Sequence, residues 1–193
     1  PSGYVDQEVP LSGTASAGIL SPKGALIFSP LEQWDIFFNY GRGFHSPDIR
    51  DMVRNADAQI PDAHVGELST RLRLGRRFDV AVSIWLAYVE DELFFDPDLG
   101  RSIGRGESRR MGEEVEIRWA PWRRLMVYAD LGYTDARLLE DDSPVVGSPR
   151  WMATVGACLH DFKGFHANAR MRHIGARPLD KARMSEAATV VDL

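Results

Sequence analysis

The sequence has little of what marks several large protein classes. It contains one cysteine, Cys158, which excludes an intrachain disulfide and a cysteine-rich zinc site. No apolar run reaches the roughly 18 residues of a membrane-spanning helix; the longest, 80–89, is shorter and includes Ser83. Lysine and arginine number 23 against 28 aspartates and glutamates, so the formal net charge is −5. This balance argues against a nucleic-acid-binding protein, which usually carries a basic excess.

The motifs of common enzymes are also missing. The sequence has no G-x-S-x-G elbow, no phosphate-binding loop and no dinucleotide-binding fingerprint. Its histidines form neither H-E-x-x-H nor a three-ligand spacing; they are His45, His64, His160, His166 and His173. We therefore expect a protein that is not an enzyme, with no catalytic residue, no cofactor and no metal site. The substrate-binding residues are left unknown.

A few side chains could still bind a metal or transfer a proton: His64 with Asp62, His166, the carboxylates Glu113, Glu114 and Glu116, the thiol of Cys158, and the acidic run 140–142. Glu114 and Glu116 have the same parity, so a strand would place both on one hydrated face. Cys158 lies between Ala157 and Leu159, which favours a small filler residue. The acidic run lies in a long loop and is interpreted as solvated surface.

Alternation with period two recurs along the chain, whereas helical periodicity is nearly absent. Residues 111–119 place Met111, Val115, Ile117 and Trp119 on one face, with Glu113 as the exception, and Gly112, Glu114, Glu116 and Arg118 on the other. Residues 68–74, 125–134 and 165–172 alternate in the same way. These patterns predict strands with one apolar and one polar face.

The lengths of the expected strands and loops favour a membrane barrel. Strands are expected at 34–42, 65–74, 79–91, 109–119, 125–137, 150–160 and 165–175. Ordinary strands average about 5–6 residues, whereas a strand tilted across a bilayer needs about 9–11. Short turns at 29–33, 75–78, 120–124 and 161–164 alternate with long loops at 44–63, 92–107, 138–149 and 176–188. Outer-membrane barrels sort short turns and long loops to opposite sides in this manner.

Aromatic residues gather toward the ends of these strands. They are Trp34, Tyr40, Phe94, Phe95, Trp119, Trp122, Trp151, Phe162 and Phe165. Such positions suit the aromatic girdles at the two interfaces of a barrel. The alternative is that large aromatic side chains fill the ends of a soluble core.

Several segments, in order along the chain, resemble the TonB-dependent outer-membrane receptor family. The similar segments are 20–30 (S-P-K-x-x-L-x-Y-x-P in the family, with Phe28 in the Tyr place), 39–50 (N-Y-G-x-G-F-x-S-P-x-x-R), 109–117 (R-x-x-G-x-E-x-E), 128–136 (Y-x-x-Y-x-Y-x-D-A, with Leu131 in a Tyr place), 145–150 (V-x-G-x-P-R), 173–179 (x-x-G-x-R-P) and 189–193 (Y-x-V-x-D-L without its Tyr). The resemblance covers nearly the whole chain from about Leu20 onward.

The resemblance implies an all-β fold, a partial antiparallel transmembrane β-barrel. Residues 1–193 would form about eight to nine strands from the second half of a 22-stranded barrel, as an open curved sheet. The plug domain, the TonB-binding segment and the final strands would lie outside it. The charged face would line a hydrated lumen, through Arg71, Arg73, Glu114, Glu116, Arg118, Asp130, Arg170 and Arg172.

The resemblance also implies a transport function in the outer membrane of a Gram-negative cell. The partners would be outer-membrane lipid, the protein's own plug domain, the TonB complex and a small-molecule or metal-chelate ligand, with no nucleic acid. A ferric siderophore is the first candidate ligand, followed by cobalamin, haem or a glycan.

Two alternatives remain open at this point. One is a passive outer-membrane pore without a plug. The other is a soluble β-sandwich domain with a binding or hydrolytic role. The chain begins without Met and ends as a strand begins, so we expect it to be part of a longer protein.

Overall fold

The computed structural model describes residues 19–44, 62–90, 93–96, 101–104, 106–179 and 183–193. Regular structure in these ranges consists of β-strands. Within the same ranges, no helix is long and apolar enough to cross a membrane. His45 and most of the expected loop 44–63 lie outside the described residues.

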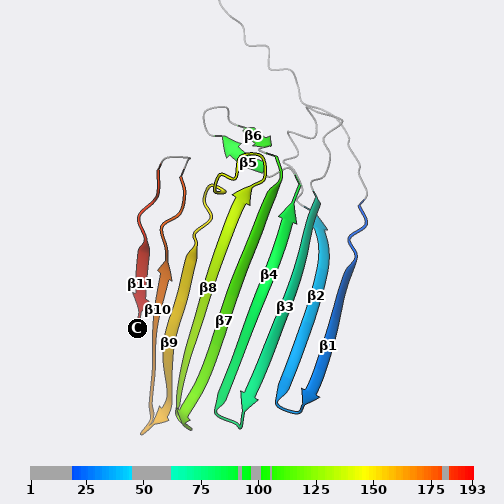
Figure 1. Ribbon diagram of the computed structural model, residues 1–193. Helices are drawn as coiled ribbons and strands as arrows, with labels where there is room; N and C mark the ends of the chain where they lie inside the picture. The colour runs from blue at the N-terminus through cyan, green and yellow to red at the C-terminus, as the bar shows by residue number, and fades with distance from the viewer. Residues whose placement is uncertain (1–18, 45–61, 91–92, 97–100, 105, 180–182) are drawn as a thin grey trace, which may run out of the picture.

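Nine antiparallel strands form one sheet, in the order β1-β2-β3-β4-β7-β8-β9-β10-β11. Their bounds are β1 (Lys23–Leu31), β2 (Trp34–Phe44), β3 (Asp62–Leu74), β4 (Phe78–Val89), β7 (Ser108–Trp122), β8 (Leu125–Leu138), β9 (Trp151–Phe162), β10 (Phe165–Ile174) and β11 (Ala188–Asp192). Figure 1 shows a single curved sheet, open between β1 and β11. The predicted all-β fold and the open curved sheet are confirmed.

The segment 92–107 differs from the sequence prediction of an irregular loop. It contains a separate two-stranded antiparallel sheet, β5 (Leu93–Asp96) with β6 (Arg101–Gly104). Each strand has only four residues. Alternation over so short a run does not stand out from the loops around it, which is why the sequence pattern missed this hairpin.

Several strands run further into the turns than the alternation indicated. β7 continues through Trp122, because a bulge between Trp119 and Trp122 absorbs the break in alternation at Ala120 and Pro121. β9 likewise reaches Phe162, which pairs with Phe165 across a two-residue turn. In that turn Lys163 and Gly164 both have positive φ, 53° and 83°, as a tight hairpin of the primed type requires.

The sheet has a single layer, so few described side chains are buried. The buried hydrophobic cluster consists of Ala136, Leu138 and Val145, where the segment after β8 folds back on the end of that strand. Val145 is 2% exposed, and its backbone N–H donates to the Ala136 carbonyl at 3.0 Å. A β-sandwich buries a core between two sheets. The soluble-sandwich alternative is therefore wrong.

Candidate functional site

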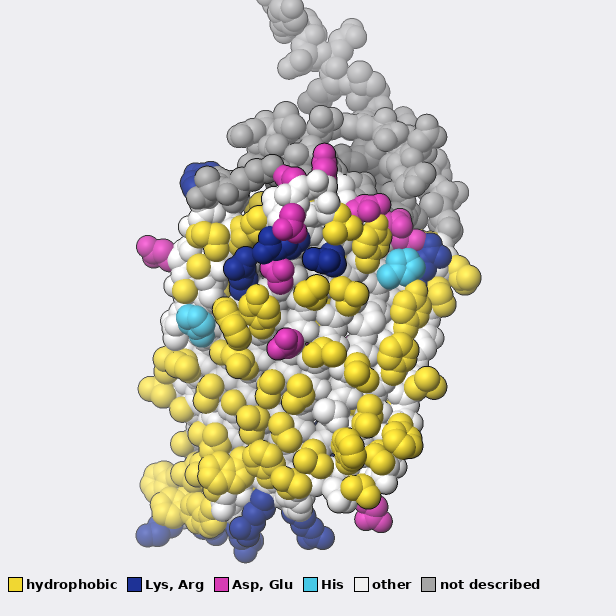
Figure 2. All heavy atoms as spheres, viewed as in Figure 1, with side chains coloured by type: hydrophobic (Ala, Val, Ile, Leu, Met, Phe, Trp, Pro, Cys, Tyr) yellow, Lys and Arg dark blue, Asp and Glu magenta, His cyan; other side chains and the backbone are white. Residues whose placement is uncertain are grey.

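The two faces of the sheet differ sharply in chemistry. The strand register gathers one set of hydrophobic side chains, here called the apolar face: Leu26, Phe28, Phe38, Leu68, Val80, Val82, Ile84, Val115, Ile117, Leu131, Val155, Met171 and Val191. Many of them are exposed, Leu26 to 71% and Ile84 to 52%. Figure 2 shows this face as a broad hydrophobic surface with few charges in its middle. So much exposed apolar area is rare on a soluble protein and suits contact with lipid.

Aromatic and polar side chains border the apolar face at its two ends. At the end with the short turns lie Trp34, Trp119, Trp122, Phe162 and Phe165. At the end with the long loops, a row of residues paired from strand to strand crosses five strands: Arg42, His64, Tyr88, Arg109 and Arg137. In β7 the stretch from Arg109 to Trp119 covers about 25 Å at about 3.3 Å per residue and a tilt of about 40°, the height of a barrel's apolar band.

The opposite face, here called the polar face, carries the charged residues expected to be hydrated. Two neighbouring rows of cross-strand pairs hold nearly all of them. One row contains Asp35, Arg71, Glu116, Asp130, Thr154 and Arg172; the next contains Arg73, Asp79, Arg118, Tyr128, Arg170 and Asp192. The predicted division of residues between the two faces is confirmed for every strand on which it was made.

Ion pairs connect the two rows of the polar face. Arg73 lies 2.7 Å from Asp35, which also accepts a 2.6 Å hydrogen bond from the Ser29 hydroxyl. Arg71 lies 2.9 Å from Asp79, while Arg118 and Glu116 are 3.6 Å apart. Asp192 accepts hydrogen bonds from Arg170 at 3.0 Å and Arg172 at 3.1 Å. These pairs fulfil the structural role expected of these residues and cross-link β1 through β4 and β10 to β11.

A group of carboxylates in the middle of the polar face has fewer cationic partners to neutralise its charge. Glu116 and Asp130 are directly paired across β7 and β8, so like charges oppose each other. Glu114 and Asp130 have no ion pair or side-chain hydrogen bond within the described residues. These three side chains and Arg172 line one open hollow of the sheet. These carboxylates form a charged wall, and among the described residues they belong to no group that could hold a metal ion.

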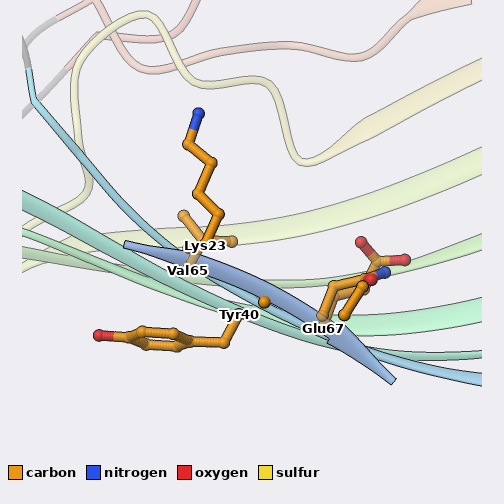
Figure 3. A pocket seen from close by; sticks show the side chains of 8 residues that line it. Lys23, Tyr40, Val65 and Glu67 are labelled. Carbon is orange, nitrogen blue, oxygen red and sulfur yellow. The ribbon is translucent and has the colours of Figure 1, made fainter. Parts of the chain in front are cut away.

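A second hollow lies near the loop end of β1, β2 and β3, and includes Lys23, Tyr40, Val65 and Glu67 in its lining. Figure 3 shows Lys23 and Glu67 on one side of the sheet and the Tyr40 ring on the other. The hollow is thus an open depression along the edge strand, with the two faces of the sheet contributing different side chains. It does not enclose a ligand-sized cavity among the described residues.

The histidines considered as metal ligands have other contacts. His64 Nδ1 lies 2.8 Å from the Tyr40 hydroxyl, whereas Asp62 pairs with the Arg42 guanidinium. His173 contacts the Thr189 hydroxyl at 2.9 Å. The rings of His160 and His166 approach to 6.5 Å between centroids, without a carboxylate or thiol completing a metal-binding group in the described part of the chain.

Cys158 and two residues of the acidic run have hydrogen-bond or ion-pair partners as well. The Cys158 thiol donates to the Asn168 amide oxygen at 3.1 Å on the polar face. In the acidic run, Asp142 lies 3.1 Å from Arg137, and Asp141 accepts a hydrogen bond from the Ser143 backbone N–H. Glu113 remains on the apolar face, between Ile84 and Tyr133, as the alternation predicted.

Sequence reasoning missed the row of polar residues that borders the apolar face at the loop end. Arg42 and Asp62 come from strands on either side of a long loop, and only the register of β2 with β3 brings them together. A signal was present, since Arg42, His64, Arg109 and Arg137 all interrupt the apolar parity of their strands near the loops. Strand pairing was needed to show that these interruptions line up.

Comparisons with known proteins agree with this geometry. The family described as TonB-dependent receptor-like β-barrel matches residues 3–193. Among solved structures, the ferric-catecholate import receptor Fiu from E. coli K12 has a TM-score of 0.66 at 17% identity, over 88% of this chain and 27% of its own. The copper transporter OprC has a TM-score of 0.71 at 14% identity, over 89% of this chain and 30% of its own. The ferric citrate transporter FecA has a TM-score of 0.69 at 16% identity, over 89% of this chain and 29% of its own.

At these identities the structural likenesses establish the fold. This chain spans about three tenths of the length of those structures. The family match extends over nearly the whole sequence. A single sheet with one apolar face and one polar face is the architecture of such a barrel's wall. The chain belongs to the TonB-dependent receptor-like β-barrel family.

Proposed function

We propose that this chain is part of the barrel wall of an outer-membrane receptor that imports a scarce, bulky nutrient with energy delivered through TonB. The family match over residues 3–193 is the observation that carries this proposal. The exposed apolar face supports it, because a bilayer is the environment in which such a face is stable. Because the family consists of transport receptors, we infer a transport role and not an enzymatic one.

The proposed orientation follows from the distribution of turns and loops. The short turns between β1 and β2, β3 and β4, β7 and β8, and β9 and β10 would face the periplasm, and the long connections the cell exterior. The apolar face would contact lipid, and the polar face a hydrated lumen closed by the protein's own plug domain. Partly exposed charges such as Glu114 and Asp130 would then hydrogen-bond to the plug or to water.

The ligand we favour is a ferric siderophore. Fiu imports ferric catecholates, FecA ferric citrate, and OprC copper, so each of these structural neighbours carries a metal or metal chelate. Cobalamin, haem or a glycan are the other candidates. The outer loops, of which 44–63 is the longest, would carry the specificity together with the plug.

Uptake measurements in the parent organism test this proposal. Deletion of the gene should abolish the uptake of one iron-labelled chelate from a panel of catecholate, hydroxamate and citrate complexes, and the loss should be restored by the full-length gene. Deletion of TonB should abolish the same uptake. Normal uptake of every chelate together with loss of cobalamin, haem or glycan uptake would reassign the ligand. Loss of none of them would contradict the receptor function.

The passive-pore alternative makes a different prediction in the same experiment. A pore conducts down a gradient, so its flux should persist without TonB and after collapse of the inner-membrane proton gradient. A TonB-dependent receptor should lose uptake under both conditions.

A further inference from the structure

Basic side chains are concentrated at the turn end of the sheet. The turn after β3 contains Arg76 and Arg77, the turn after β7 consists of Arg123 and Arg124, and the turn after β9 contains Lys163. Glu32, in the turn after β1, is the one acidic residue among these turn positions. Figure 2 shows Lys and Arg side chains gathered at this end, directly beyond the apolar face. The whole chain is acidic, with a formal charge of −5, so this cationic end opposes the overall charge.

Backbone hydrogen bonds hold the basic turns side by side. The Ala120 N–H donates to the Arg77 carbonyl at 2.7 Å, and the His160 N–H donates to the Arg124 carbonyl at 2.7 Å. Each turn is thus bonded to the strand of the next hairpin. The cations therefore form one continuous rim along the turn end of the sheet.

The basic rim lies against the aromatic border of the apolar face. The guanidinium carbon of Arg124 is 6.0 Å from the centre of the Trp122 ring, and Lys163 Nζ is 5.8 Å from the centre of the Phe162 ring. Trp122 and Phe162 touch edge to face, with centroids 5.6 Å apart. Hydrocarbon, aromatic rings and cations thus follow one another within a few ångströms, in the order of acyl chains, interface and headgroups in a bilayer leaflet.

The rim cations have few protein partners to neutralise them. Arg76, Arg77, Arg123 and Lys163 are exposed, and Arg124 is half-buried. Among the described residues, none of the five has an ion pair or a side-chain hydrogen bond to a carboxylate. Phosphate oxygens form strong charge-assisted hydrogen bonds with arginine and lysine, and a leaflet presents them at this depth.

From this arrangement we propose that the basic rim binds the phosphodiester groups of anionic phospholipids in the leaflet that contains the turns. The inference rests on the proposed function, since it requires the sheet to cross a bilayer, and it goes beyond transport. Three neighbouring hairpins would collect anionic lipid, and the bound headgroups would fix the depth of the barrel in the membrane.

The test measures the thermal unfolding midpoint of the full-length protein in vesicles of phosphatidylcholine, with and without phosphatidylglycerol of the same chain length. A lipid that binds the folded barrel raises the midpoint. At low salt, phosphatidylglycerol should raise the midpoint of the native protein by several degrees, and high salt should reduce that rise. The variant R76Q/R123Q/K163Q should lose at least half of the rise. The charge-conserving variant R76K/R123K/K163R, which has the same number of substitutions, should keep it.

The outcomes distinguish a failure of the lipid-binding rim from a failure of the membrane placement. An equal rise in the native protein and in R76Q/R123Q/K163Q overturns the lipid-binding rim and leaves the barrel intact. The same conclusion follows if inorganic phosphate in pure phosphatidylcholine vesicles reproduces the whole rise, because the acceptor would then not be a lipid. Failure of the native protein to insert into either vesicle, seen as no heat-modifiable band, overturns the membrane placement itself.

Discussion

The aromatic ring of Tyr128 lies over Gly156, its partner on the neighbouring strand. A Cβ atom built on Gly156 would overlap the Tyr128 ring, and one built on Gly112 would lie only 2.5 Å from the Trp85 ring. Both pairs lie on the polar face, at directly opposed positions. In each pair the absent side chain of glycine makes room for an aromatic ring to lie flat along the sheet, which pins the register of the two strands.

The variant Gly156→Ala should therefore destabilise the barrel, because the Tyr128 ring must leave its place. We expect a loss of about 1–3 kcal/mol, the usual cost of overpacking. Gly132→Ala is the matched control, since a Cβ there would meet Glu114 at an ordinary 3.8 Å. The unfolding midpoints of the two full-length variants in detergent, followed by heat modifiability, make the comparison. Equal midpoints would show that the position of the Tyr128 ring does not depend on a glycine at residue 156.

Arginine on the apolar face should impair assembly more than arginine on the polar face. Val115 and Leu131 are paired in the middle of the apolar face, where a cationic side chain costs about 2–4 kcal/mol. Glu116→Arg would instead place a cation opposite Asp130. The yield of folded, heat-modifiable protein in outer-membrane fractions should fall for Val115→Arg and Leu131→Arg and stay near the native level for Glu116→Arg. Similar yields for all three variants would contradict the assignment of the faces.

Removal of the Glu113 carboxylate from the apolar face should stabilise the barrel slightly. Glu113 lies near the loop-end border, four positions along β7 from Arg109, where an ionised side chain costs about 0–1 kcal/mol. Glu113→Leu should raise the free energy of unfolding by no more than that amount, seen as a slightly higher unfolding midpoint when both proteins are measured in the same lipid. A lower midpoint would mean that the carboxylate has a favourable partner, such as a lipid amine or a bound cation.

The ion pairs of the polar face should differ in strength according to geometry and exposure. Arg73 and Asp35 approach to 2.7 Å, with the aspartate side chain only 14% exposed, whereas Arg118 and Glu116 are 3.6 Å apart and both 53% exposed. Double-mutant cycles with Asp35→Asn and Arg73→Gln should give a coupling of about 0.5–1 kcal/mol. The cycle with Glu116→Gln and Arg118→Gln should give a coupling near zero. Equal couplings would show that the hydrated lumen screens both pairs alike, and a larger coupling for Glu116 and Arg118 would contradict the ranking by geometry and exposure.

The alternation of side chains predicted most of the fold. It assigned Val115 to one face and Glu116 to the other, and it located every strand from β2 to β10 in the main sheet, because the side-chain period of a strand is fixed by backbone geometry. The family resemblance added β1 and β11 at the two edges. Strand ends were less well predicted, since Trp122 and Phe162 lie beyond residues that break the alternation.

Contacts that depend on pairing between strands could not be predicted from the pattern. The row that includes Arg42, His64 and Arg137 needs the register of several strands, and register is set by turn lengths and by bulges such as the one before Trp122. The motifs in the sequence likewise include no ligand-binding constellation, because under the proposed function recognition would involve loops and a plug domain beyond this sheet.

The order of the strands has a consequence for how the barrel forms. Every strand of the large sheet pairs only with the strands of that sheet that come directly before and after it in the sequence. The small β5–β6 hairpin lies between β4 and β7 in the sequence and forms a sheet of its own. No strand must wait for a distant segment of the chain to be synthesised or delivered, so the loop-closure entropy at each pairing step stays small. The wall can grow by one hairpin at a time, because each added hairpin leaves a free edge on which the next can pair.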